Sequence, residues 1–124
     1  MQVAVVGCGG IGGAHARAYA LLPDVKLVAC VDRDAGRAGA LAQSHGAAAL
    51  TDLDDLPAGV DVVSVATDPA THYPVAKRLL ERGHHVFCEK PLALEPAEAL
   101  ELALLARERG RALSVGFKMR YEPV

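Results

Sequence analysis

Short apolar runs alternate along the chain with longer segments in which apolar residues recur every three or four positions. The apolar runs span residues 2–6, 25–31, 47–50, 61–66, 85–89 and 112–117. Several are nearly continuous in valine, alanine, leucine and cysteine, which is typical of parallel strands that helices cover on both faces. The pattern therefore predicts an α/β fold, a doubly wound parallel sheet built from βαβ units.

Four helices are predicted between the strands, at about residues 10–22, 34–45, 73–82 and 96–109. In the first helix, the residues expected to pack on the sheet are the apolar ones at helical spacing, Ile11, Ala14, Ala18 and Leu21. Residues 51–59 are expected to form a loop with at most one helical turn.

Capping residues, proline and glycine mark the ends of these helices. Asp34 is a candidate N-cap of the second helix, and Gly46 lies where a left-handed C-cap residue would follow it. Pro74 is expected in the first turn of the third helix. Pro96 begins the fourth helix and Gly110 follows it, in agreement with the preference for proline at the start of a helix and glycine after its end.

The length of 124 residues predicts one domain rather than two, and argues against a composite enzyme that carries its own substrate domain. The net charge of −2 and the absence of a dense Lys/Arg cluster argue against nucleic acid or an anionic membrane as a partner. No apolar run reaches the roughly 18 residues of a membrane span, and no basic leader precedes the first strand, so we expect a cytoplasmic location. The three widely spaced cysteines predict reduced thiols rather than disulfides.

A glycine-rich turn joins the first strand to the first helix. Gly7, Gly9 and Gly12 form a G-x-G-x-x-G pattern, and Gly10 and Ile11 open the helix. Gly7 suits a tight turn, Gly9 lets the backbone approach a pyrophosphate, and Gly12 lets the helix lie close to the sheet. Because strand, turn and helix occur together, we interpret the pattern as a dinucleotide site rather than a purely structural turn.

Asp32 stands at the end of the second strand, twenty residues after Gly12. A carboxylate there accepts hydrogen bonds from ribose hydroxyls and repels a 2′-phosphate, which favours NAD over NADP. The alternative role, capping the next helix, can be filled by Asp34 alone. Arg33 leaves NADP as an alternative cofactor, since its guanidinium could pair with a phosphate or stack on the adenine.

Two further segments are informative beside the glycine turn and the Val31-Asp32-Arg33 end of the second strand. The first is Ala66-Thr67, followed by His72, and the second is Glu89-Lys90-Pro91. The chain resembles the N-terminal domain of the Gfo/Idh/MocA oxidoreductases, the glucose–fructose oxidoreductase and inositol dehydrogenase family. The resemblance implies strand order 3-2-1-4-5-6 and NAD(P)-dependent hydride transfer between nicotinamide and a secondary alcohol or ketone of a sugar, cyclitol or similar polyol. It also implies that Ala66, Thr67, Pro69 and His72 form the cofactor wall; the alternative is a turn in which Asp68 or Thr71 caps the next helix.

Glu89, Lys90 and Pro91 lie at the carboxyl end of the fifth predicted strand, where ligands of open parallel sheets bind. A lysine there can hydrogen-bond the reacting oxygen and stabilise its developing charge, so Lys90 is the candidate catalytic residue and also a cofactor contact. Glu89, a further candidate cofactor contact, could hold the Lys90 ammonium in place. The alternative is that Lys90 is a solvated side chain in a turn. The sequence does not decide whether the Lys90-Pro91 peptide bond is cis or trans.

The remaining histidines and cysteines are assigned no ligand role. His84 and His85 are expected at the surface, with rings on opposite faces of a strand. Cys8 could have a lowered pKa beneath a helix N-terminus, although buried packing is the alternative. No metal site is predicted.

The resemblance implies that residues 1–118 are a dinucleotide-binding domain and that residues 119–124, with Met119 and Arg120, start a crossover to a substrate domain. We expect the chain to be either a fragment of a longer enzyme without that substrate domain or a stand-alone cofactor module. The expected function is the cofactor half of a polyol or sugar dehydrogenase, weakly active or inactive alone. The alternatives are a non-enzymatic NAD-binding sensor module and a structural domain without nucleotide affinity. Exposed apolar surface could also support a homo-oligomer.

Overall fold

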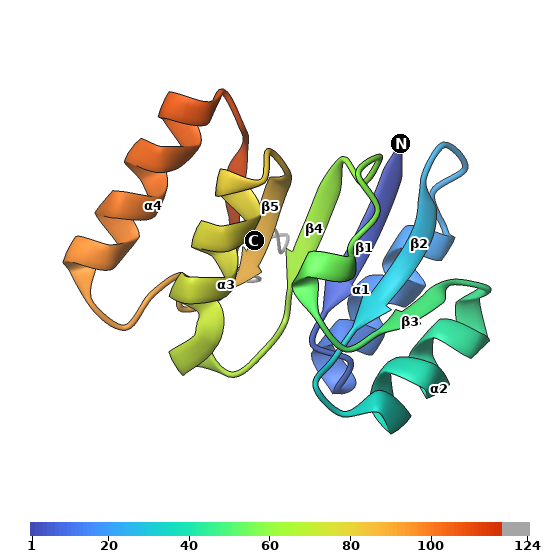
Figure 1. Cartoon of the computed structure of the whole chain (residues 1–124). Coiled ribbons are helices and arrows are strands. Elements are labelled where there is room, and N and C mark those ends of the chain that lie inside the picture. The colour runs from blue at the N-terminus through green and yellow to red at the C-terminus, as the bar shows by residue number, and fades with distance from the viewer. Residues whose placement is uncertain (118–124) are drawn as a thin grey trace, which may run out of the picture.

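The computed structural model describes residues 1–117; residues 118–124, including the predicted crossover, lie outside the described part. Six strands alternate with four α-helices and one short 3₁₀ helix (Figure 1). The strands are β1 (Gln2–Val6), β2 (Lys26–Val31), β3 (Ala48–Leu50), β4 (Val62–Val65), β5 (His85–Glu89) and β6 (Leu113–Gly116). The helices are α1 (Gly10–Ala20), α2 (Ala35–His45), η1 (Leu53–Asp55), α3 (Pro69–Glu81) and α4 (Pro96–Arg109).

All strand pairs are parallel, and the strand order is β3-β2-β1-β4-β5-β6. The predicted doubly wound fold is confirmed. The chain moves outward from β1 to β3, then returns to β4 on the other side of β1. The loops that follow β1 and β4 therefore diverge, and this switch point is where open α/β sheets bind ligands.

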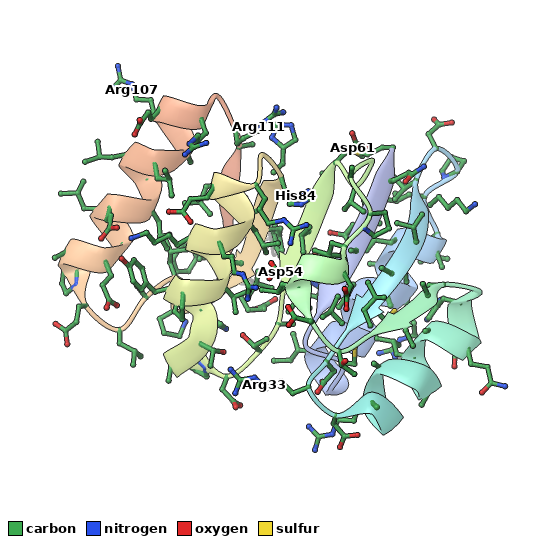
Figure 2. All side chains as sticks on the ribbon, in the orientation of Figure 1. Arg33, Asp54, Asp61, His84, Arg107 and Arg111 are labelled. Carbon is green, nitrogen blue, oxygen red and sulfur yellow. The ribbon has the colours of Figure 1, made fainter. Side chains whose placement is uncertain are left out.

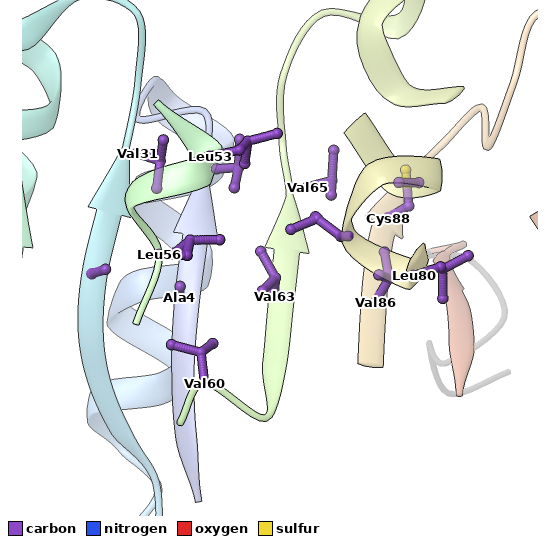
Figure 3. Close-up of a cluster of buried hydrophobic side chains, with 14 of the residues drawn as sticks. Ala4, Val31, Leu53, Leu56, Val60, Val63, Val65, Leu80, Val86 and Cys88 are labelled. Atoms are coloured by element: carbon purple, nitrogen blue, oxygen red, sulfur yellow. The ribbon is translucent and has the colours of Figure 1, made fainter. Parts of the chain in front are cut away.

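Helices cover both faces of the sheet, which explains why the strands lack apolar and polar alternation. On one face, α3 and the η1 segment pack on strand side chains such as Val63, Val65 and Val86 (Figure 3). Leu102 and Ala106 of α4 belong to the same cluster. On the other face, Ala16 of α1 and Ala42 of α2 pack on a smaller cluster that includes Val5. The central strands β1, β2 and β4 are thus buried on both sides, whereas the edge strands β3 and β6 contain no fully buried residue.

Several helix ends agree with their sequence signals. The Asp34 side chain caps α2 by accepting hydrogen bonds from the backbone N–H groups of Gly36 and Arg37, at 2.9 and 3.2 Å. Gly46 and Gly110 follow α2 and α4 in the left-handed conformation, with φ of 65° and 64°. The predicted single turn within residues 51–59 is η1.

The face of α1 that packs on the sheet was predicted wrongly. Leu21 and Ile11 are 84% and 56% exposed, and the buried residues of α1 are Gly12, Gly13 and Ala16. The helix approaches the sheet through its smallest side chains, because a close backbone contact leaves no room for a larger one. Apolar periodicity alone therefore indicated a face that points away from the core.

Helix α3 begins earlier than predicted, at Pro69 rather than near residue 73. Pro69 occupies the first helical turn, where a missing N–H has no consequence, and Asp68 precedes it at the N-cap position. Pro74 therefore lies inside the helix rather than in its first turn. Burial of Ala76, Leu79 and Leu80 against the sheet compensates for the hydrogen bond that Pro74 cannot donate.

His84 is buried, contrary to its expected place at the surface, with 4% of its area exposed. Its Nδ1 lies 2.7 Å from the carbonyl oxygen of Val60, which satisfies the ring in the core. Within residues 1–117, no helix combines the length and the apolar character that crossing a bilayer requires.

Candidate functional site

The carboxyl ends of β1, β2 and β4 are in register, because Val6 pairs with Val31 on one side and with Val65 on the other. An open cavity of about 740 Å³ lies at this edge of the sheet. Figure 2 shows Arg33 at this edge and Asp61 at the opposite end of the strands. The predicted site residues that line the cavity are Gly7, Gly9, Gly10, Ile11, Asp32, Arg33, Ala66, Thr67 and Pro69.

The glycine turn has two positions that only glycine fits and two that are open. Gly7 has a φ of +92°, and a Cβ there would lie 2.5 Å from the carbonyl oxygen of Ala66. A Cβ on Gly12 would lie 1.7 Å from the carbonyl oxygen of Gly7. A Cβ on Gly9 or Gly10 would meet no atom within 4 Å. Gly7 and Gly12 are therefore required by the fold itself, whereas the space above Gly9 and Gly10 is free for a ligand.

Helix α1 begins at this turn without a side-chain cap. Its first backbone hydrogen bond joins the N–H of Gly13 to the carbonyl of Gly9, at 2.9 Å. The N–H groups of the preceding first-turn residues have no partner within the helix. Together with the helix dipole, they make the cavity favourable for an anion such as a diphosphate.

Asp32 ties the end of β2 to the glycine turn. Its Oδ2 accepts a hydrogen bond from the backbone N–H of Cys8 at 2.9 Å, and its Oδ1 accepts one from the backbone N–H of Asp34 at 2.8 Å. Each carboxylate oxygen has a second lone pair, so the group can still accept hydrogen bonds from ribose hydroxyls. The bond to Cys8 is a role that sequence analysis missed.

Arginine side chains of the cavity differ in their partners. Arg78 forms an ion pair with Asp54, and Arg37 lies 3.8 Å from an oxygen of Asp34. Arg33 has no carboxylate partner among residues 1–117. Its guanidinium remains available beside Asp32 for an adenine ring or a phosphate group.

His72, by contrast, is buried outside the cavity lining, with 1% of its area exposed. Its Nε2 lies 2.9 Å from the carbonyl oxygen of Thr67, and its Nδ1 lies 2.6 Å from that of Pro91. The hydroxyl of Thr71 lies 2.7 Å from that of Thr67 and also steadies this loop. His72 therefore joins the loop after β4 to the segment after β5 and does not itself line the cavity.

Glu89 pairs with His15 of α1, with 2.8 Å between Oε1 and Nε2. Glu89 was predicted to hold the Lys90 ammonium, but no hydrogen bond or ion pair joins these two side chains in the described part of the chain. Lys90 itself is exposed, and its peptide bond to Pro91 is cis. The register that pairs Glu89 with Gly116 of β6 places this tripeptide at the same edge of the sheet as the glycine turn.

His15 is the residue that sequence analysis missed at this edge. It follows Gly12 by three positions, which is one helical turn, and so lies on the same side of α1. That spacing was the available signal, but it became meaningful only once the buried face of α1 was known. Its partner Glu89 is 74 residues away in the sequence.

Cys8 does not have the lowered pKa that its position suggested. The Cys30 side chain, burial and the charge of Asp32 all raise the pKa of the Cys8 thiol. Burial, aided by the neighbouring Glu89, raises the pKa of Cys88 to about 12. Both thiols are therefore protonated at neutral pH. Separately, residues 1–117 contain no group of three or more His, Cys, Asp or Glu side chains that could hold a metal ion.

We expect the two fully buried thiols, Cys30 and Cys88, to react slowly in the folded chain. At pH 8, below the raised pKa of Cys88, an aromatic disulfide reagent should leave the fully buried Cys30 and Cys88 unmodified. In denaturant all three cysteines should react. Absorbance of the released thiolate measures both rates, and a Cys8→Ser variant identifies the contribution of the partly exposed Cys8. Rapid modification of all three thiols under native conditions would contradict the expectation.

A comparison with protein families assigns all of the described residues to a single family. The family profile described as "Oxidoreductase family, NAD-binding Rossmann fold" matches residues 1–117. An inositol 2-dehydrogenase of Rubrobacter xylanophilus is 40% identical over 99% of this chain, and a UDP-N-acetylglucosamine 3-dehydrogenase of Acidithiobacillus ferrooxidans is 36% identical over 99%. The chain spans 37% and 39% of those two proteins, respectively.

Solved structures agree with this assignment. The crystal structure of GenD2 from gentamicin A biosynthesis, in complex with NAD, is 41% identical with a TM-score of 0.96, over 99% of this chain and 36% of that one. KijD10, a 3-ketoreductase from Actinomadura kijaniata solved with TDP-benzene and NADP, is 29% identical with a TM-score of 0.93, over 99% and 40%. Structures similar to this chain therefore include both NAD and NADP complexes.

Proposed function

Because the chain belongs to the Gfo/Idh/MocA oxidoreductase family and matches its NAD-binding Rossmann domain over residues 1–117, we propose that it is the cofactor half of a dehydrogenase acting on a sugar or cyclitol. The observation that carries this proposal is the open space above Gly9 and Gly10, beside the uncapped start of α1 and next to Asp32. A diphosphate and a ribose fit that arrangement. The sensor alternative gains no support, because the relatives described above are named as dehydrogenases.

Each part of the cavity has its own binding role in this proposal. The amides of Gly10 and Ile11 hold the diphosphate, and Asp32 accepts hydrogen bonds from the adenosine ribose. Arg33 flanks the adenine. Thr67, with Ala66 and Pro69 beside it, forms the wall near the nicotinamide end.

Lys90 is the proposed catalytic residue. Its ammonium donates a hydrogen bond to the oxygen of the reacting alcohol or ketone and offsets the negative charge that grows there. It also shares in moving the hydroxyl proton. The nicotinamide ring supplies the hydride acceptor or donor when the cofactor is bound. Lys90 suits this task because it is exposed at the carboxyl edge of the sheet.

Calorimetric titration tests the first part of the proposal. The folded chain should bind NADH and, more weakly, NADPH, because the carboxylate of Asp32 repels a 2′-phosphate. A chain shown to be folded by circular dichroism that binds neither dinucleotide at millimolar concentration would contradict the proposal.

Asp32→Ala should weaken NADH binding by about 10-fold to 100-fold, the range expected for hydrogen bonds to a charged group. The loss for NADPH should be smaller, since the same substitution removes a repulsion. Calorimetry with both cofactors measures the difference. Equal losses for the two cofactors would remove Asp32 from the ribose site.

The matched control is Asp34→Ala, two residues away. Asp34 caps α2 through Gly36 and Arg37, so its loss should destabilise the fold by about 1 kcal/mol. NADH affinity should stay within about twofold of the original. This control separates loss of the ribose contact from a general loosening of the segment after β2.

A further inference from the structure

We propose that His15 and His72 are positioning residues that hold Lys90 in place from opposite faces of the sheet, by binding the residues on either side of it. The inference rests on the proposed function, in which Lys90 meets the reacting oxygen. It adds the elements that fix the lysine relative to the bound dinucleotide. Glu89 and Pro91 are the residues through which the two histidines act.

His15 holds the residue before Lys90. Its Nε2 lies 2.8 Å from Oε1 of Glu89, and the two side chains are 14% and 21% exposed. The His15 ring also contacts the ring of Phe87 edge to face, with 5.3 Å between centroids. On its other side the Glu89 carboxylate lies against Gly116, where a Cβ would come within 3.0 Å of Oε1. Glu89 is therefore fixed from α1 and from β6.

His72 holds the residue after Lys90. Its Nδ1 is 2.6 Å from the carbonyl oxygen of Pro91, and its Nε2 is 2.9 Å from that of Thr67. Carbonyl oxygens only accept hydrogen bonds, so a neutral ring donates to one of them and a protonated ring to both. Either way the ring is buried between the two segments and fixes their separation.

The two histidines connect Lys90 to the segments that are proposed to contact the cofactor. His15 lies on α1, three residues after Gly12 of the glycine turn, and His72 bonds Thr67 of the cavity wall. A catalytic group must be held close to its productive geometry, because small displacements reduce the rate strongly. Lys90 has an exposed, flexible side chain, so its placement depends on the backbone at Glu89 and Pro91.

A purely structural role is the alternative, since buried polar groups are hydrogen-bonded throughout proteins. His84 provides the matched control. It is also buried and also lies near a backbone carbonyl, that of Val60 at 2.7 Å. It precedes β5 at the amino end of the strand, whereas Lys90 follows the carboxyl end. Loss of His84 should affect stability without affecting Lys90.

The test observes Lys90 directly in the 124-residue chain. The sequence contains four lysines, Lys26, Lys77, Lys90 and Lys118, so ¹⁵N-lysine labelling gives a simple amide spectrum. The amide signal that is missing from the Lys90→Arg spectrum is that of Lys90, and the Lys26 signal serves as an internal reference. In the original chain NADH should shift the Lys90 signal, and ADP-ribose, which lacks the nicotinamide, should shift it much less.

In His15→Leu and His72→Leu, the NADH-induced shift of Lys90 should fall by at least half while NADH affinity stays within about twofold. His84→Leu should retain the full shift. His15→Gln should restore most of it, because an amide can donate to Glu89 as the imidazole does. If a leucine variant does not fold, His15→Ala and His72→Asn replace it, and each folded variant should lose part of the Lys90 shift.

Four results would overturn the inference, and they differ in what else they affect. A full Lys90 shift in folded His15 and His72 variants would show that Lys90 is placed without them. The same loss of shift in His84→Leu would assign the histidines to stability alone. An original chain that binds NADH without any Lys90 shift would place Lys90 away from the nicotinamide, whereas a chain that binds neither ligand would end the proposed function as well.

Discussion

Replacing Gly12 with alanine is expected to destabilise the folded chain by about 3 kcal/mol or more, at the upper end of the range for overpacking a close contact. The added Cβ would lie 1.7 Å from the carbonyl oxygen of Gly7, which is backbone and cannot rotate away. Either α1 must move off the sheet or the glycine turn must open. Thermal unfolding followed by circular dichroism should show a midpoint lower by about 10 °C, and NADH binding should be lost with the turn.

Gly9→Ala is the matched variant at the same turn. Gly9 has an ordinary φ of −81°, and its Cβ would meet no atom within 4 Å. The fold should therefore keep its stability, while NADH binding weakens by about tenfold or more because the methyl group occupies the space proposed for the diphosphate. Similar unfolding midpoints for Gly12→Ala and Gly9→Ala would contradict the packing argument, and unchanged NADH affinity in Gly9→Ala would contradict the placement of the diphosphate.

Lys90→Met is expected to lower turnover by about 100-fold to 1000-fold, the loss typical of removing a group that stabilises charge on a reacting oxygen. The measurement requires a substrate domain, so the chain would be fused to that part of the Rubrobacter xylanophilus inositol 2-dehydrogenase and assayed with inositol. NADH affinity should be nearly intact, because the glycine turn and Asp32 are the proposed contacts for most of the cofactor.

Lys77→Met is the control for this experiment. Lys77 lies on α3, where it pairs with Glu101 of α4 at 2.7 Å, away from the cavity. Its loss should leave turnover in the fusion unchanged. Undiminished turnover in Lys90→Met, or an equal loss in Lys77→Met, would remove Lys90 from the mechanism.

Much of the fold could be predicted because its signals are local. The near-continuous apolar strands, the Asp34 cap and the glycines after α2 and α4 each depend on neighbours in the sequence, and the structure agrees with them. The spacing of Gly7, Gly9 and Gly12 likewise indicated the turn at which the cavity lies. The weakest local inference was the buried face of α1, since the contact distance to the sheet, not hydrophobicity, selects small residues there.

The sequence by itself determined the doubly wound class of fold, the glycine turn and the carboxylate at the end of β2. Tertiary structure alone decided that His15 meets Glu89 across 74 residues, and that His72 joins Thr67 to Pro91. Those contacts depend on how α1 and α3 are rotated against opposite faces of the sheet, and no local pattern encodes that rotation. It follows from the packing of the whole domain, which brings side chains from separate helices to the two residues that flank Lys90.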